Sequence, residues 1–219
     1  INDTRISFDE VDHNYFIDGE KAKFSVTEII DKFFPEFDSA YWAERKAIEK
    51  LNQDTTEYDS DILNAAIKKI LDDWEKKRND AALKGTLLHE RIEDFYNQKF
   101  HTEYPPEFEY FKNFHNKYEK LEAYRTEWRI YDDSLSLAGT VDMVYKKENN
   151  ELFIFDWKRT SKLVDHNNQL VLKDFNYGFD GLSHIADNSF NKYALQQNVY
   201  KFILENYYDK TISSMNLLI

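Results

Sequence analysis

The 219-residue sequence contains no cysteine and has few glycines and prolines, five and three respectively. The lack of cysteine excludes disulfides, thiolate zinc sites and cysteine-ligated iron–sulfur clusters, so any metal must have oxygen or histidine ligands. No segment approaches the roughly eighteen apolar residues of a membrane span, and no secretory or transit signature is present. We therefore expect an intracellular protein, cellular or viral, that has no membrane partner.

Basic residues are also in the minority, with 29 Lys and Arg against 41 Asp and Glu and a net charge of −12. This balance argues against a generic nucleic-acid coat protein, which would be basic. It does not argue against a nuclease, because a substrate groove needs positive charge only locally. Such a local reversal occurs at Lys158, Arg159 and Lys162.

The chain is rich in aromatic residues, with 17 Phe, 15 Tyr and 4 Trp, which predicts a folded protein with a substantial core. A β-hairpin is expected within residues 5–17. A short helix follows, which starts at the capping-box pattern Ser25-Val-Thr-Glu28 and ends before Pro35. Apolar residues at helical spacing predict further helices over 39–52, 60–79, 81–98, 106–121 and 190–206.

Between the last two of these helices the apolar period changes to that of strands. Residues 124–131, 136–145 and 151–158 predict a three-strand meander, and a final strand is expected at 212–219. The order indicates an α/β fold with helices packed on a sheet. We expect a hairpin and helical elaboration over 1–80 and a core over 81–219, which form one compact domain of a longer polypeptide.

The most informative segment is residues 138–160, AGTVDMVYKKENNELFIFDWKRT. It predicts two strands joined by a polar turn, so that Asp142 and Asp156 can face each other, with Lys158 on the same face as Asp156. Two carboxylates and an ammonium are costly to bury in a sheet unless a divalent cation is bound there. A metal ion so held can polarise a phosphate and activate water, which favours a metal-dependent phosphodiesterase.

Two helical patterns flank this segment. Gly85, His89 and Glu93 recur at four-residue spacing, so they share one helix face on which the glycine would permit a close approach to the sheet. His-Glu-x-x-Glu lacks the second histidine of the zinc-protease pattern, which excludes that metalloprotease class. Gln196 and Tyr200 are likewise four apart, and could contact a nucleic-acid backbone or support the metal site.

In their order, Gly-x-x-x-His, Gly-Thr-Val-Asp, Asp-x-Lys and Gln-x-x-x-Tyr resemble the motifs of the PD-(D/E)XK nuclease superfamily. The resemblance is closest to its RecB-like exonuclease branch, which includes bacterial recombination nucleases, CRISPR adaptation nucleases and a mitochondrial single-strand exonuclease. The segment 193–200 is also similar to nuclease domains of large DNA viruses. The match covers roughly residues 81–219 and implies a restriction-endonuclease-like core of helix, three-strand meander, helix and strand.

The resemblance also implies roles for individual residues. The implied ligands of Mg²⁺ or Mn²⁺ are His89, Asp142, Asp156 and the main-chain carbonyl of Trp157. Lys158 would be the catalytic lysine, acting with Asp142 and Asp156, and Glu93 matches a helix acid of the family. The implied nucleic-acid contacts are Gln196, Tyr200, Arg159 and Thr160. Val141 replaces the proline of the superfamily name, and no cysteine is present for the iron–sulfur cluster of some relatives.

The first hypothesis is therefore a Mg²⁺- or Mn²⁺-dependent deoxyribonuclease that acts on single-stranded DNA or DNA ends in replication, recombination or repair. We expect it to be fused to or associated with a helicase or another replication or repair domain. The alternative is a catalytically inactive nuclease-fold module for DNA binding or assembly, against which the intact acids and lysine argue. A nucleotide-binding enzyme or serine hydrolase lacks the necessary glycine motifs.

The helical stretch 39–80 is less informative. Its Trp42, Trp74 and the basic cluster Lys76-Lys77-Arg78 could hold a nucleic-acid strand by stacking and charge. Such residues more often belong to the core and to a solvated helix face, and the sequence favours that interpretation.

Overall fold

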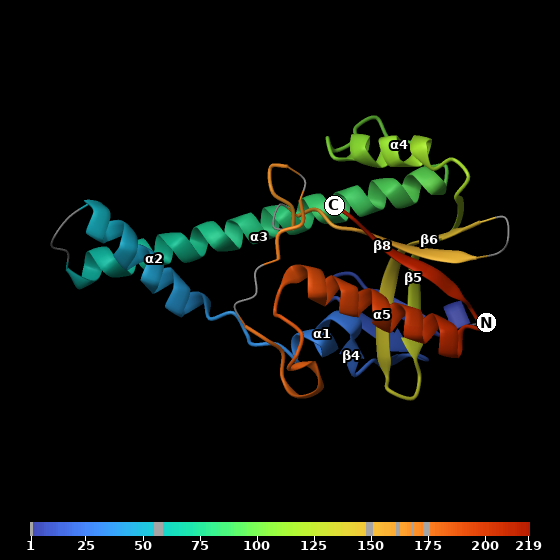
Figure 1. Cartoon of the computed structure of the whole chain (residues 1–219), viewed down its shortest axis with the longest axis horizontal. Coiled ribbons are helices and arrows are strands. Elements are labelled where there is room, and N and C mark those ends of the chain that lie inside the picture. Colours follow the sequence, from blue (N-terminus) through green and yellow to red (C-terminus); the bar gives the residue numbers. More distant parts are fainter. Residues whose placement is uncertain (1, 55–58, 148–150, 161–162, 168, 173–175) are drawn as a thin grey trace. The chain divides into compact units, whose positions relative to one another are not determined.

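The computed structural model of the chain describes residues 2–54, 59–147, 151–160, 163–167, 169–172 and 176–219 (Figure 1). The fold is mixed α/β, as the sequence predicts. Contacts divide the chain into two compact units, one formed by residues 1–35 and 88–219 and the other by residues 36–87. We call the first the sheet unit and the second the helical unit. The long helix α3 (Ser60–Tyr96) contributes residues to both.

The main sheet lies in the sheet unit and has mixed strand directions. Its central strand β6 pairs antiparallel with β5 and β7 and parallel with β4, and β7 pairs parallel with β8. The strands are β4 (Phe24–Ser25), β5 (Glu122–Asp132), β6 (Leu137–Lys146), β7 (Leu152–Trp157) and β8 (Ile212–Leu218). The predicted meander and final strand are thus present.

Helices cover both faces of this sheet because its central strands are apolar on both faces. On β7, Leu152 and Ile154 pack with α1 (Val26–Asp31) and α5 (Ser189–Tyr207). Phe155 and Trp157 point to the opposite face, toward α4 (Phe108–Lys117) and the C-terminal end of α3. Figure 1 shows α5 crossing the sheet near α1, and α4 beside α3.

The first 35 residues belong to the sheet unit rather than to the helices that follow them. β1 (Ile6–Asp9), β2 (Asn14–Ile17) and β3 (Glu20–Lys21) form a small antiparallel sheet, and the capping box of Ser25 and Glu28 starts α1 as predicted. The sequence prediction grouped residues 1–80 together. The structure groups them differently because β4 pairs with β6 and α1 packs against α5, contacts between residues far apart in the chain.

The helical unit contains α2 (Ser39–Asp54) and the first part of α3. Separate helices were predicted over 60–79 and 81–98, but α3 continues through Asn79 and Asp80. These two residues have modest helix propensity and, unlike proline, do not stop a helix. None of the described helices has the length and apolar character that would allow it to cross a membrane.

At Gly139 on β6, side chains of two helices pack tightly against the sheet. A Cβ atom there would lie 2.7 Å from Cε1 of Tyr200 on α5 and 3.0 Å from Cγ2 of Val26 on α1. At Gly85 an added Cβ would meet nothing within 4 Å, which corrects the close approach predicted for that glycine. The Gly-Thr-Val-Asp motif therefore has a packing role beside Asp142.

Replacing Gly139 with Ala should destabilise the protein by about 1–3 kcal/mol, because the methyl group overpacks a dense core. The matched control is Gly85→Ala, for which we expect no loss and a gain of up to ~1 kcal/mol from helix propensity. Urea denaturation compares the two variants. Equal stability of the Gly139 and Gly85 variants would contradict this packing role.

Candidate active site

The candidate site lies where β6 and β7 separate. Their antiparallel ladder ends at the pair Met143 and Phe155, and the next residues on the two strands are Asp142 and Asp156. The Asp142 Oδ2 atom accepts a hydrogen bond of 2.9 Å from the Trp157 main-chain N–H, which ties the two strand ends together. Asp156 is only 2 % exposed. The structure thus brings the two acids to one spot, as the sequence predicts.

His89 reaches the same spot from the C-terminal part of α3. Its Nε2 atom lies 2.9 Å from the Trp157 carbonyl oxygen and 3.7 Å from Asp142 Oδ2. Its Nδ1 atom lies 3.4 Å from Glu127 Oε1. The imidazole therefore lies between two carboxylates and a main-chain carbonyl, all of which are groups that bind cations.

Glu127 is the site residue that the sequence analysis missed. It lies within β5, between the paired residues Thr126–Met143 and Trp128–Val141, and so opposite Asp142. Its backbone is left-handed, with φ of 42°, which is uncommon for a side-chain-bearing residue and concentrates at functional sites. Two carboxylates opposite each other on neighbouring strands repel unless a cation lies near. A charged residue inside an otherwise strand-like segment was the only signal available in the sequence.

Lys158 follows β7 and turns back over the site. Its Nζ atom lies 3.0 Å from Asp156 Oδ2 and 5.0 Å from the ring centroid of Tyr193 on α5. Its main-chain N–H donates to the Leu218 carbonyl oxygen at 2.8 Å, which continues the pairing of β7 with β8. The buried Asp156 and the half-buried Lys158 therefore form an ion pair whose backbone is held by the sheet.

The buried charges strongly shift one another's pKa values. Burial, and then repulsion from Asp142, raises the pKa of Asp156 to about 7. Burial also raises the pKa of Asp142, although the nearby His89 and Lys158 oppose this effect. Burial alone would lower the pKa of His89, but Asp142 and Glu127 outweigh it and raise that pKa to about 9. Both shifts favour the protonated forms of Asp156 and His89, which offset part of the negative charge of the acids.

Gln196 and Tyr200 support the site from α5. Gln196 Nε2 donates to the Tyr200 hydroxyl at 2.8 Å and lies 3.4 Å from Thr27 Oγ1. Tyr200 is only 3 % exposed and packs in the core with Gly139. Its predicted contact with nucleic acid is therefore corrected: the buried tyrosine braces α5 against the sheet behind Asp142, whereas Gln196 remains partly exposed.

The remaining predicted site residues, Glu93, Arg159 and Thr160, lie outside the group of side chains that could hold a metal. Among the described residues, the group able to hold a metal consists of His89, Glu127 and Asp142, whose ligand atoms all lie within 4.8 Å of one another. Glu93, one turn after His89, does not belong to it. Arg159 is exposed and its Nε atom lies 2.6 Å from Glu107 Oε1. Thr160 comes next with a half-buried side chain, and Lys162 lies outside the described residues.

The donor set fits a divalent cation. The three metal-capable side chains supply one imidazole nitrogen and carboxylate oxygens, and the Trp157 carbonyl lies beside them. Asp156 Oδ1 is buried and accepts no hydrogen bond in the described part of the chain, whereas Oδ2 is paired with the Lys158 ammonium at 3.0 Å. Carboxylate, carbonyl and water ligands suit Mg²⁺ and Mn²⁺. The chain could therefore hold such an ion through His89, Glu127 and Asp142, with Asp156 adjacent.

Comparisons with models of known protein families and with curated proteins find no match to this chain. The functional conclusion consequently depends on the motifs in the sequence and on the geometry of the site.

Proposed function

We propose that this protein is a Mg²⁺- or Mn²⁺-dependent DNA nuclease of the PD-(D/E)XK type, from the RecB-like branch. The observation that carries the proposal is the convergence of His89, Glu127, Asp142, Asp156 and Lys158 where β6 and β7 separate. The half-buried ammonium of Lys158, an imidazole and three carboxylates lie together at this point. Perturbed pKa values clustered in this way are typical of catalytic sites.

The order of elements supports the same proposal. The C-terminal part of α3, the antiparallel meander β5–β6–β7, helix α5 and the parallel strand β8 follow one another as in the core that the resemblance implies. His89 lies on the first of these helices, the two aspartates lie at adjoining strand ends and Gln196 lies on α5, which supports the proposal.

Each residue has a distinct task in the proposed mechanism. His89, Glu127, Asp142 and the Trp157 carbonyl would hold the ion, with Asp156 completing its surroundings. A bound divalent ion polarises a phosphate group and lowers the pKa of water. The Lys158 ammonium, anchored by Asp156 at 3.0 Å, can orient the attacking water and stabilise charge that develops on the phosphate. Gln196 and Tyr200 keep α5 in place behind the reacting groups.

We propose single-stranded DNA or DNA ends as the substrate, in replication, recombination or repair, with a helicase or another replication or repair domain as partner. Arg159 and Thr160 directly follow the catalytic lysine and are placed to contact a strand that reaches it. In this chain Arg159 is paired with Glu107, so a phosphate would have to compete with that carboxylate.

The test is hydrolysis of DNA labelled at either end by the wild type, Asp156→Ala and Lys158→Ala, in Mg²⁺, Mn²⁺ and EDTA. The wild type should cleave only with metal, and each variant should lose about 10²–10³-fold in rate. Identical behaviour of all three proteins would remove the catalytic assignment. DNA binding without metal-dependent cleavage by the wild type would favour the inactive DNA-binding or assembly module.

A further inference from the structure

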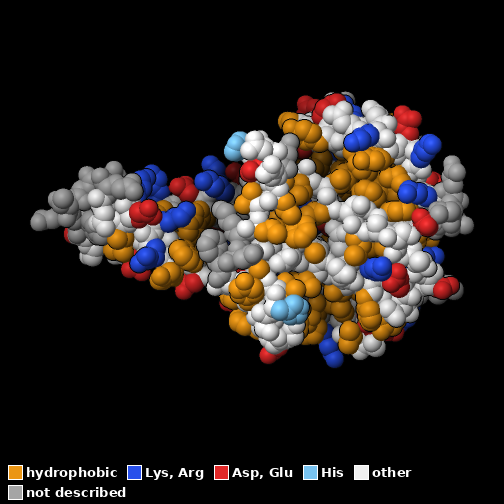
Figure 2. Space-filling view, viewed as in Figure 1, with side chains coloured by type: hydrophobic (Ala, Val, Ile, Leu, Met, Phe, Trp, Pro, Cys, Tyr) orange, Lys and Arg blue, Asp and Glu red, His pale blue; other side chains and the backbone are white. Residues whose placement is uncertain are grey.

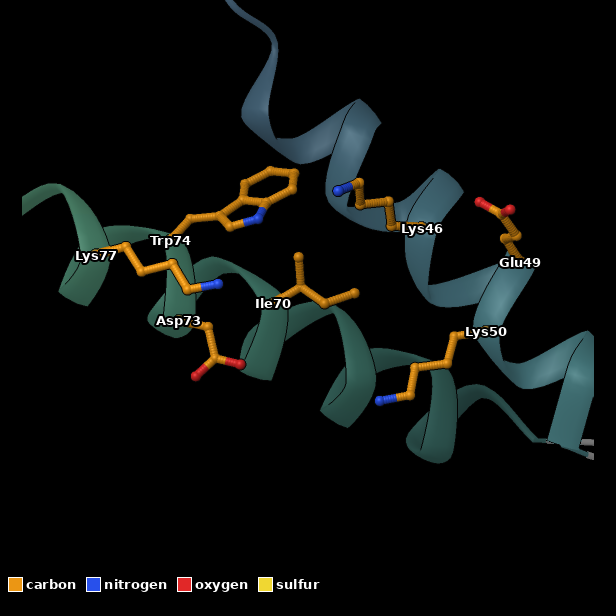
Figure 3. A pocket seen from close by; sticks show the side chains of 7 residues that line it. All are labelled: Lys46, Glu49, Lys50, Ile70, Asp73, Trp74 and Lys77. Atoms are coloured by element: carbon orange, nitrogen blue, oxygen red, sulfur yellow. The ribbon is translucent and has the colours of Figure 1, made fainter. Parts of the chain in front are cut away.

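We propose that the helical unit carries a binding site for single-stranded DNA, in a cleft between α2 and α3 centred on Trp74. The cleft has a volume of about 380 Å³, within the range of small-ligand sites. Its lining, shown in Figure 3, consists of Lys46, Glu49, Lys50, Ile70, Asp73, Trp74 and Lys77. This inference deepens the proposed function, since it names a second contact for the same substrate.

Aromatic surface is available at this cleft. The indole of Trp74 is partly exposed and extends into the space between the helices (Figure 3). The Phe37 ring lies beside it, with centroids 5.9 Å apart, and is 68 % exposed. An exposed phenylalanine next to an accessible indole does not serve the core of the unit, where Ala43 and Ala47 are fully buried. Trp74 is thus half-buried between the helices, and one side of its ring remains accessible at the cleft.

Cations surround the same rings. Lys46 Nζ lies 5.4 Å from the indole centroid of Trp74, and Lys50 and Lys77 line the cleft from the two helices. On the visible face of this unit, Lys and Arg side chains are interspersed with hydrophobic and with Asp and Glu side chains (Figure 2). Aromatic rings that stack on bases, with nearby ammonium groups that contact phosphates, are the general means of binding single strands.

The charge of the lining selects among phosphate ligands. Three lysines face two acids, Glu49 and Asp73, so the cleft has a small positive excess. This suits the single charge of a phosphodiester better than the dense charge of a nucleoside triphosphate. The sequence also has no glycine-rich phosphate loop. The carboxylates can accept hydrogen bonds from exocyclic amines of bases, so the lining fits a single nucleic-acid strand, which the proposed nuclease function makes DNA.

Binding of a fluorescein-labelled single-stranded oligonucleotide to the full chain in EDTA tests the inference, because no hydrolysis interferes. Trp74→Ala should weaken Kd about 10-fold, with Trp74→Phe in between, since one stacked base is lost or diminished. Lys50→Ala with Lys77→Ala should lower the slope of log Kd against log salt by about 1–2. The matched control is Lys76→Ala, which is adjacent in sequence but outside the lining. Circular dichroism checks the fold of each variant.

If the Trp74→Ala and Lys76→Ala variants bind the oligonucleotide with the same Kd, the inference is overturned. Preferential binding of an acidic peptide over the oligonucleotide at the same cleft would also overturn it.

The result for this binding site can be separated from the result for the proposed nuclease. Asp156→Asn should retain oligonucleotide binding, and Trp74→Ala should retain hydrolysis of bis(p-nitrophenyl) phosphate. If Trp74→Ala leaves Kd unchanged while the protein hydrolyses DNA, only the proposed binding site is contradicted. If the protein binds the oligonucleotide at this cleft but does not hydrolyse DNA, only the proposed nuclease is contradicted.

Discussion

Glu127→Gln and Asp142→Asn should each lower kcat/KM for DNA hydrolysis by about 10²–10³-fold while preserving the fold. Both changes keep the size of the side chain and remove one negative charge from the metal-capable group. Asparagine at position 142 still offers an oxygen to the Trp157 N–H that now donates to Asp142 at 2.9 Å. The loss therefore reports cation binding and transition-state stabilisation rather than unfolding. Initial rates at a fixed, sub-saturating Mn²⁺ concentration measure it.

The matched control for this prediction is Glu93→Gln. Glu93 also lies on α3 near His89, and the family resemblance favoured it as the helix acid, but it lies outside the metal-capable group. Its replacement should change kcat/KM less than about 3-fold. If Glu93→Gln is as damaging as Glu127→Gln, the carboxylate from β5 is not the one that completes the site.

The second prediction concerns stability in the absence of metal, which should fall steadily as the pH rises from about 4 to 9. The pKa of Asp156 is about 7 in the fold and that of His89 about 9. Both are above the values of an unfolded chain, so the protonated forms stabilise the fold. For each group this stabilisation is complete below the pKa that the group has in the unfolded chain. It is lost as the pH rises through the pKa that the group has in the folded protein. For Asp156 alone the loss amounts to at most ~4 kcal/mol.

Denaturation in urea at pH 5, 6, 7 and 8, with EDTA or Mn²⁺, measures this dependence. Among these pH values Mn²⁺ should stabilise the protein most at pH 8, where the fewest protons compete with the ion for its ligands. Asp156→Asn should flatten the metal-free profile between pH 5 and 7. The control Asp18→Asn should leave that interval parallel to the wild type, because its hydrogen bond with Arg5 lowers the pKa of the exposed Asp18. A metal-free wild type that gains stability toward pH 8 would contradict the proposed electrostatics.

The parts of the structure that sequence could predict are those governed by local rules. On β7 the alternation of Leu152 and Ile154 with Phe153 and Phe155 places the two pairs on opposite faces, and in the structure they pack in separate apolar clusters. The Ser25–Glu28 capping box is likewise a local pattern and was found as predicted. The meeting of Asp142 and Asp156 follows from the register of a short hairpin.

What could not be predicted depends on long-range contacts or unusual backbone. Glu127 turns toward the site through a left-handed residue in the middle of a strand, which no periodicity reveals. The pairing of β4 with β6 joins residues more than 100 positions apart, so the first 35 residues were grouped with the wrong neighbours in space. Tyr200 resembled a ligand-contacting residue by motif, yet the absence of a side chain at Gly139 lets it enter the core.

The most direct test of the central claim is the binding of Mn²⁺, followed by electron paramagnetic resonance of the free ion at pH 8. We expect the wild type to bind Mn²⁺, Glu127→Gln and His89→Gln to bind it at least about 10-fold more weakly, and Glu93→Gln to match the wild type. Unchanged Mn²⁺ affinity in the Glu127 and His89 variants, or no binding by the wild type, would contradict the account.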